Sequence, residues 1–246
     1  MKLAHRAAVV PVAAVVSVLA AFTFAVPAGG AAVPAVPSVK VTATVAVGAR
    51  PLAVAVNPLA NTVYVANAHG HSVSVVNGQT NTVVATVPVR RLPQGVAVNQ
   101  ATGRIYVANT NSGTVSVING QTNTVVATIP VGGVPVGVAA NPVTGRIYVT
   151  SDGTEAVSVI SEQTNTVVAT IGVGRAPVGV AVNPRTNTID VANEVSNSVS
   201  VISGRTNTVK ATVHHVPTPV AVAVNPATNV IYVTNAFQNT VSVLAG

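Results

Sequence analysis

The chain repeats itself every 42 residues, and this period limits its fold more than any other feature of the sequence. Each unit holds four short runs of Val, Ile and Thr, as in QGVAVN, RIYVAN, TVSVIN and TVVATIPV of residues 94–131. Such runs are too short for helices and suit the pleated surface of strands. Proline and asparagine recur at the same spacing: Pro51, Pro93, Pro135, Pro177 and Pro219, and Asn57, Asn99, Asn141, Asn183 and Asn225. A four-strand unit of this length is typical of a β-propeller blade.

The turns inside each unit carry residues that tolerate a positive φ. At the fifth position of the turn between the first two runs only Asn and Gly occur: Asn61, Gly103, Gly145, Asn187 and Asn229. The turn between the last two runs places Asn in the same role: Asn81, Asn123, Asn165 and Asn207. We expect a left-handed backbone at all of these positions. Because both turns are short, each unit is predicted to be a four-stranded antiparallel meander.

The first run of each unit alternates small residues with Val. Ala or Gly stands at positions 53, 95, 137, 179 and 221, and Ala follows two residues later in every unit. Small side chains let neighbouring backbones approach closely. The first run is therefore predicted to be the innermost strand, which lines the central channel.

The last unit stops at Gly246 without its fourth run, whereas residues 38–48, SVKVTATVAVG, hold a fourth run that no unit precedes. Residues 37–246 number 210, which is five times 42. We therefore predict an all-β fold, a five-bladed β-propeller that strand 39–47 closes by pairing with strand 240–244. An open solenoid would need polar end caps, which the sequence lacks. A larger ring shared by two chains stays open as an alternative.

The N-terminal residues predict export from the cytoplasm. Lys2 and Arg6 precede an uncharged apolar stretch, 7–26, and small residues around Ala28 offer a cleavage site. Residues 1–28 are thus predicted to be a signal peptide, 29–37 a flexible linker and 38–246 the propeller domain, in a secreted or cell-envelope protein. The alternative is an uncleaved anchor, because about 20 apolar residues can span a bilayer.

The tetrapeptide YVTN at 232–235, with YVAN at 64–67 and 106–109, resembles the signature of the YVTN-family β-propeller repeat proteins, also described as surface-layer-like or YncE-like propellers. The stretch TVSVINGQTNTVVATIPVG is equally similar to them, and the resemblance covers residues 38–246. It implies a secreted or cell-envelope propeller that acts as a binding scaffold, with no shared catalytic motif. Such propellers more often have seven blades, whereas this chain has material for five.

The turns fall into a uniform and a variable group. A meander places the first and third turns of each unit on one face, where the repeats are nearly identical. The second turns and the connections between units lie on the other face, called the variable face, and differ from unit to unit. Loops on a rigid scaffold are common binding sites. We expect the variable face to bind an anionic group through Arg50, Arg90, Arg91, Arg175, His69, His71, His214 and His215. The alternative is a solvated face whose loops have drifted.

The composition and motifs of the chain argue against several kinds of catalytic, metal and nucleic-acid site. There is no cysteine, and no nucleophile elbow, phosphate loop or HExxH is present. The histidine pairs lack a nearby carboxylate, so no metal site is expected. The net charge of +7 includes Lys2 and Arg6, and no Lys/Arg run exceeds two residues, which disfavours nucleic-acid binding. We predict a non-enzymatic scaffold without cofactor, whose partner is an envelope polymer or protein. The alternative is a lactonase-like or lyase-like propeller enzyme with its site at the channel mouth.

Asp190 departs from the repeat. The other units have tyrosine at this position, Tyr64, Tyr106, Tyr148 and Tyr232, and these are predicted to pack between blades. A buried carboxylate without a partner is costly or stays protonated. We expect Arg185 or a backbone donor to satisfy Asp190, or the position to face water, and a role as a catalytic acid stays open.

Overall fold

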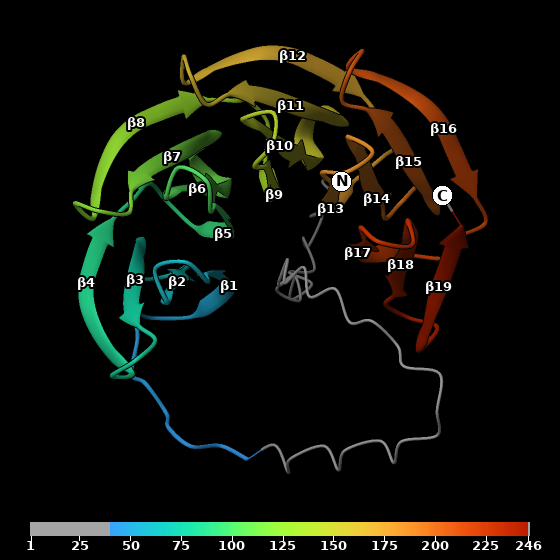
Figure 1. Cartoon of the computed structure of the whole chain (residues 1–246). Helices are drawn as coiled ribbons and strands as arrows, with labels where there is room; N and C mark the ends of the chain where they lie inside the picture. The colour runs from blue at the N-terminus through green and yellow to red at the C-terminus, as the bar shows by residue number, and fades with distance from the viewer. Residues whose placement is uncertain (1–39, 246) are drawn as a thin grey trace, which may run out of the picture.

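Residues 40–245 are described by the computed structural model, and they form five antiparallel sheets arranged in an arc around a central channel (Figure 1). The predicted signal peptide, 1–28, and linker, 29–37, lie outside the described residues. Within the described part of the chain, no helix combines the length and apolar character needed to cross a bilayer.

Four sheets have four strands and the fifth has three, always paired in chain order. The first sheet contains β1 (Pro51–Asn57), β2 (Thr62–Asn67), β3 (Ser72–Asn77) and β4 (Thr82–Pro88). The second contains β5 (Pro93–Asn99), β6 (Arg104–Asn109), β7 (Thr114–Asn119) and β8 (Thr124–Pro130). The third contains β9 (Pro135–Asn141), β10 (Arg146–Ser151), β11 (Ala156–Ser161) and β12 (Thr166–Gly172). The fourth contains β13 (Pro177–Asn183), β14 (Thr188–Asn193), β15 (Ser198–Ser203) and β16 (Thr208–His214). The fifth contains β17 (Pro219–Asn225), β18 (Val230–Asn235) and β19 (Thr240–Ala245).

The predicted four-stranded meander is confirmed in four sheets, and the fifth sheet contains its first three strands. Strands β1, β5, β9, β13 and β17 lie innermost, and β4, β8, β12 and β16 form the outer rim (Figure 1). Two short 3-10 turns, η1 (Thr110–Ser112) and η2 (Asp152–Thr154), follow β6 and β10. The nine turn positions expected to be left-handed all have a positive φ, between 47° at Asn61 and 69° at Gly103.

In most sheets, the asparagine that ends the second strand bonds to hydroxyl groups of the third strand and so stabilises the turn between the two strands. Asn67 donates through Nδ2 to the hydroxyls of Ser72 (3.1 Å) and Ser74 (2.9 Å). Asn109, Asn193 and Asn235 make the same pair of bonds to the hydroxyls five and seven residues later. The final Asn of the YVAN and YVTN motifs is thus explained as a structural residue that links the second strand to the third.

The core lies in the seams between neighbouring sheets. Tyr64 of the first sheet packs with Ile105 and Val107 of the second, and Tyr106 and Tyr148 repeat this contact at the next two seams. All three rings are at most 1% exposed. Burying an aromatic side chain of this size is a large apolar contribution to stability. The prediction that the tyrosines pack between sheets is confirmed at these three seams.

The small residues of the innermost strands permit the close approach of neighbouring sheets. A Cβ atom added to Gly95, Gly137 or Gly179 would overlap the carbonyl oxygen of Val136, Val178 or Val220 on the next sheet. Backbone atoms cannot yield as the end of a side chain can. Glycine at these three seams therefore lets the innermost strands pack closely against one another around the channel.

Replacing Gly137 by alanine is expected to lower the free energy of unfolding by about 2 kcal/mol, because the new methyl forces two backbones apart. Thermal unfolding measures the effect. The matched control is Gly172→Ala in β12, where an added Cβ meets no atom within 4 Å. We expect the control to melt like the parent or slightly higher. Equal melting temperatures for the Gly137→Ala variant and the parent would contradict the close approach.

The predicted pairing of strand 39–47 with strand 240–244 is not formed among the residues that the structure describes, and the closed ring stays a prediction. Residues 40–47 contain no strand, Val41 is 86% exposed, and β19 pairs only with β18. The physical reason is that residues 40–47 lead directly into β1. They can reach β19 only when the fifth sheet lies beside the first, and an opening separates these two sheets (Figure 1).

Candidate functional site

The loops of the variable face are of the two kinds that the repeats predict, the second turns and the connections between units. These two kinds of loop are joined by backbone hydrogen bonds: Ala68 N–H donates to the Arg50 carbonyl (2.9 Å) and His69 N–H to that of Ala49 (3.2 Å). The second to fifth sheets repeat the first of these bonds. The opposite turns are joined likewise, as in the bond from Gly78 N–H to the Asn61 carbonyl (2.8 Å). The division into two faces is therefore confirmed.

The loops around the first sheet bring several predicted residues together. Arg50 donates through Nη1 to His69 Nε2 (2.8 Å), and the Leu92 backbone N–H donates to His71 Nδ1 (3.2 Å). Arg91, next to Leu92, is exposed like Arg50. These contacts fix the side chains of both histidines while the guanidinium groups stay accessible to solvent.

A second group lies on the third and fourth sheets. Arg175 forms an ion pair with Glu155 (3.7 Å), and both side chains are more than half exposed. Arg175 also lines a shallow groove together with His214 and Ser196. An exposed pair of this kind contributes little to stability. Arg90 and His215 are exposed and lie on the connections that follow the first and fourth sheets. The eight predicted residues thus occupy two separate areas of one face.

Charge is divided unevenly between these areas. The described acids of the variable face are Asp152, Glu155 and Glu194, all on the third and fourth sheets. Burial, and then the Asp152 carboxylate, raise the pKa of Glu194. Three arginines, in contrast, lie on the connections before and after the first sheet: Arg50, Arg90 and Arg91. The first-sheet end of the variable face is consequently positive without a neighbouring acid.

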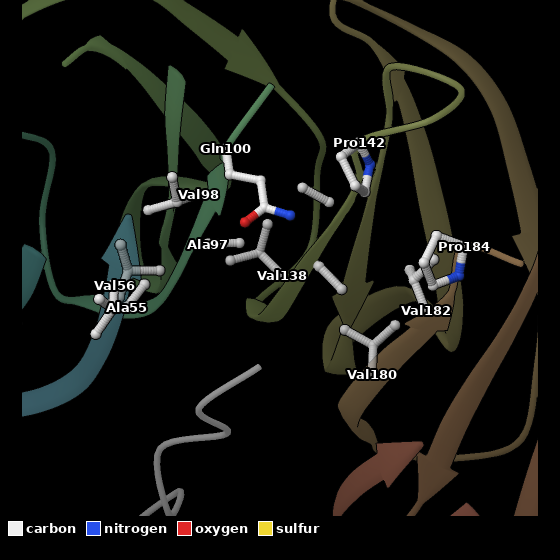
Figure 2. Close-up of a pocket in the computed structure, with 13 residues that line it drawn as sticks. Ala55, Val56, Ala97, Val98, Gln100, Val138, Pro142, Val180, Val182 and Pro184 are labelled. Carbon is white, nitrogen blue, oxygen red and sulfur yellow. The ribbon is translucent and has the colours of Figure 1, made fainter. Parts of the chain in front are cut away.

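The central channel holds a cavity of about 100 Å³ at the opposite face, and most of the side chains that line it are apolar. Figure 2 shows it between the innermost strands, with Val98, Val138 and Val180 on its walls and Pro142 and Pro184 at its rim. Gln100, which stands where the other repeats have proline, is the polar side chain of this lining. The described lining offers no acid or base for catalysis.

Asp190 lies in β14 and is 1% exposed. Neither carboxylate oxygen has a hydrogen-bond partner in the structure, so Arg185 and the backbone do not satisfy it, contrary to expectation. Burial raises the pKa of the Asp190 carboxyl to about 7, and the Lys210 ammonium opposes the shift in part. The expectation that the position could face water is also wrong, because the fifth sheet covers the seam in which it lies.

Glu162 is a residue that the sequence comparison missed. It stands where the other four repeats have glycine, Gly78, Gly120, Gly204 and Gly246, and it is 7% exposed. Its carboxylate accepts hydrogen bonds from Asn99 Nδ2 (2.6 Å) and from the Thr102 hydroxyl, both on the second sheet. An alignment of the repeats could have identified Glu162, because it is the exception at a position of the uniform face where the other repeats have glycine.

The role of Glu162 follows from the neighbouring seams. Asn141 donates to Asn187 Oδ1 (2.9 Å) and Asn183 to Asn229 Oδ1 (2.6 Å), each across to the next sheet. The third sheet has Gly145 at the corresponding acceptor position. Glu162 therefore supplies the acceptor that Gly145 lacks, and the hydrogen bond between sheets is kept.

No group of three or more His, Asp or Glu side chains able to hold a metal ion occurs among residues 40–245. The two histidine pairs of the sequence lie on the first and fourth sheets and do not converge with carboxylates.

The NHL repeat family matches residues 91–118, which span the connection before β5 and most of the three strands β5 to β7. The match covers one repeat of the chain. It supports a β-propeller repeat protein, while the resemblance to the YVTN family stays a prediction. No curated protein sequence matches the chain.

Solved structures with the same arrangement are numerous, with 1356 matching chains, so the fold alone does not identify a function. A chain of Kuenenia stuttgartiensis Hydrazine Synthase has a TM-score of 0.71 and 27% identity, over 80% of this chain and 58% of that chain. A functionally unknown protein from Desulfotomaculum acetoxidans has a TM-score of 0.67 and 17% identity, over 78% of this chain and 68% of that one. The chain thus spans less than two thirds of the first neighbour's length.

Proposed function

We propose that the protein is a non-enzymatic binding scaffold that holds an anionic partner on the first-sheet end of its variable face. The observation that carries this proposal is the uneven division of charge. Arg50, Arg90 and Arg91 lie on the connections that flank the first sheet, and the acids of this face lie on the third and fourth sheets. A polyanion is attracted to the one end and repelled from the other.

Local order supports this assignment. The hydrogen bond from Arg50 to His69 and that from Leu92 N–H to His71 hold the loops in one arrangement before a partner binds. Preorganised side chains lose less conformational entropy on binding than mobile ones. In keeping with the sequence of residues 1–28, we propose that the partner is an anionic polymer or protein of the cell envelope.

A propeller enzyme is the second candidate, since one structural neighbour carries the name of an enzyme. The cavity in the channel argues for the scaffold instead. Its described walls are Ala, Val and Pro with one glutamine, and these side chains cannot act as general acid or base.

Replacing Arg50, Arg90 and Arg91 together by serine is expected to weaken binding to immobilised poly(glycerol phosphate) about tenfold or more, because three attractive charges are lost. Binding by the parent should also weaken as salt is added. The matched control is Arg175→Ser, which removes an arginine from the acidic end of the same face. The proposal fails if the triple variant binds like the parent, or if the Arg175→Ser variant loses as much affinity.

We also propose that the arc closes in solution when residues 40–47 pair with β19. The backbone enters the first sheet as it enters the second, fourth and fifth, with a positive φ at Arg50 (52°), Leu92 (55°), Ala176 (52°) and Thr218 (43°). The chain before Arg50 is thus oriented like the outer strand of a preceding sheet.

The two ends of the arc offer matching surfaces. Tyr232 of the fifth sheet is 44% exposed, whereas its three counterparts are buried. Val63 and Val65 of the first sheet are only partly buried, whereas Ile105 and Val107, their counterparts, are fully buried. Closure would place the exposed side of the fifth sheet against the partly exposed side of the first sheet, and both would be buried in one further seam.

A further inference from the structure

The cavity in the central channel contains a polar side chain that departs from the repeat. Gln100 follows Asn99 in the turn after β5, where the other sheets have proline: Pro58, Pro142, Pro184 and Pro226. The Gln100 side chain is half-buried, and Figure 2 shows its carboxamide pointing into the cavity. The second sheet therefore adds a hydrogen-bonding group to the cavity at a position where the other sheets have none.

The turn itself does not require glutamine at this position. Asn99 Oδ1 accepts a hydrogen bond from the Ala101 backbone N–H (3.0 Å), and the asparagines of the four proline-containing turns accept the equivalent bond. The hydrogen bonds that residues 99–103 form in the structure involve Asn99, Ala101, Thr102 and Gly103, and none of them involves the Gln100 carboxamide. The donor and the acceptor of this carboxamide are thus available to a ligand.

The side chains around the Gln100 carboxamide are apolar and uncharged. Val98, Val138 and Val180 of three innermost strands form the walls, with alanines beside them, and none of the lining residues carries a charge. An ion would lose hydration in the cavity without gaining a partner of opposite charge. The cavity therefore favours an uncharged ligand.

The volume of the cavity limits the ligand to a small ring. The cavity measures about 100 Å³. A protein cavity of about 150 Å³ holds benzene. Pro142 and Pro184 at the rim are half-buried, so the cavity is open to solvent on the uniform face and a ligand can extend slightly beyond it. A ring of about six non-hydrogen atoms therefore fits.

A carboxamide pairs best with a group that carries an acceptor beside a donor. In a cyclic amide the C=O and the N–H lie on the same side of the amide bond, so both can bond to one glutamine side chain. We propose that the cavity binds a small uncharged cyclic amide, whose N–H and C=O meet the Gln100 carboxamide and whose ring methylenes contact the valines. Apolar burial of the ring supplies affinity, and the two hydrogen bonds select the amide.

This site is independent of the proposed function, because it lies at the uniform-face end of the channel and Arg50, Arg90 and Arg91 lie on the variable face. The triple arginine-to-serine variant should bind the cyclic amide like the parent. A Gln100→Pro variant should likewise keep its affinity for poly(glycerol phosphate). Failure of either proposal therefore leaves the other intact.

NMR titration of the full chain with 2-pyrrolidinone tests the inference, with the valine methyl signals as the readout. We expect binding at millimolar concentration or better, with the largest shifts at Val98, Val138 and Val180. Cyclopentanone has the same ring size but lacks the N–H. It should bind about fivefold more weakly, because one hydrogen bond is lost.

Gln100→Pro restores the residue of the other sheets, so it should fold, and it removes both hydrogen bonds. We expect it to bind 2-pyrrolidinone about tenfold more weakly than the parent, and to bind 2-pyrrolidinone and cyclopentanone equally well. Gln100→Met keeps the length of the side chain without the amide and should show the same loss, which gives a second test if the proline variant does not fold.

The matched control is Gln79→Leu, which removes an exposed glutamine of the same face outside the cavity and should bind like the parent. The proposal is overturned if 2-pyrrolidinone does not bind, or if its largest shifts lie away from the three valines. It is also overturned if cyclopentanone binds the parent as tightly, or if a folded Gln100→Pro or Gln100→Met variant binds 2-pyrrolidinone like the parent.

Discussion

Replacing Asp190 by asparagine is expected to remove most of the loss of stability that the parent shows between pH 4 and pH 7. Asp190 is 1% exposed, and neither of its oxygens has a hydrogen-bond partner. Asparagine has nearly the same volume and no charge at any pH. Urea unfolding at a series of pH values, followed by circular dichroism, measures the difference.

The sign follows from the two states of the chain. Burial raises the pKa of the folded carboxyl from 3.8 to about 7, with Lys210 opposing in part. Well below pH 3.8 the carboxyl is protonated in both states and has no effect on stability. As the pH rises toward 7, the unfolded state has released the proton and the folded state still holds it. Stability therefore falls, by about 4 kcal/mol in all, and changes no further above the folded pKa.

Two further variants sharpen this test. Asp190→Tyr restores the residue of the other repeats, and it should raise stability at pH 7 because it removes the charge and fills the seam. Glu155→Gln, an exposed position on the third sheet, should keep the pH dependence of the parent. A small slope will remain in every variant, since the raised pKa of Glu194 acts in the same direction. An unchanged slope in the Asp190→Asn variant would show that this carboxyl is not buried.

Deleting residues 40–46 is expected to lower the melting temperature by about 10 °C if the arc closes in solution. In the first three sheets the outer strand buries one large side chain against its neighbour, Val87, Ile129 or Ile171, each at most 5% exposed. Val45 is the counterpart in residues 40–47 and is only half-buried in the open arrangement. Losing this burial and uncovering β19 should cost about 4 kcal/mol. An unchanged melting temperature would favour the open arc.

An engineered disulfide distinguishes closure from exchange between molecules. Val75 pairs with Ala85 in the first sheet, and the repeat places Val243 opposite Ala43 in the same register. Since the chain has no other cysteine, the Ala43→Cys, Val243→Cys variant can form only this bond within one molecule. We expect a monomer with an internal disulfide. A disulfide-linked dimer, or two free thiols after mild oxidation, would contradict closure within one chain.

The local structure of every unit could be predicted from the sequence, because it depends on interactions within about 20 residues. Asn61 and Gly103 indicated left-handed turns by their residue type alone, and both have a positive φ. The small residues at Gly95 and Gly137 indicated the inner strand, since only a close neighbour explains their recurrence. The tyrosine spacing likewise indicated packing between sheets.

The placement of the polar groups could not be predicted, because it depends on contacts across a seam. The sequence showed that Asp190 replaces a tyrosine, but only the structure shows a buried carboxyl without a partner. Glu162 lies in a turn, and the fold brings it to Asn99 of the neighbouring sheet, 63 positions away.

The sequence by itself determined the strands, their turns, their order within each sheet and the division into a uniform and a variable face. These features recur every 42 residues, so that comparing the copies within the chain shows which residues each strand and turn requires. Only the tertiary structure decided the arc, the hydrogen bonds of Glu162 across a seam, and the burial of Asp190 without a partner. The curvature of the arc is the sum of small rotations at each seam, and side-chain packing there sets every one of them.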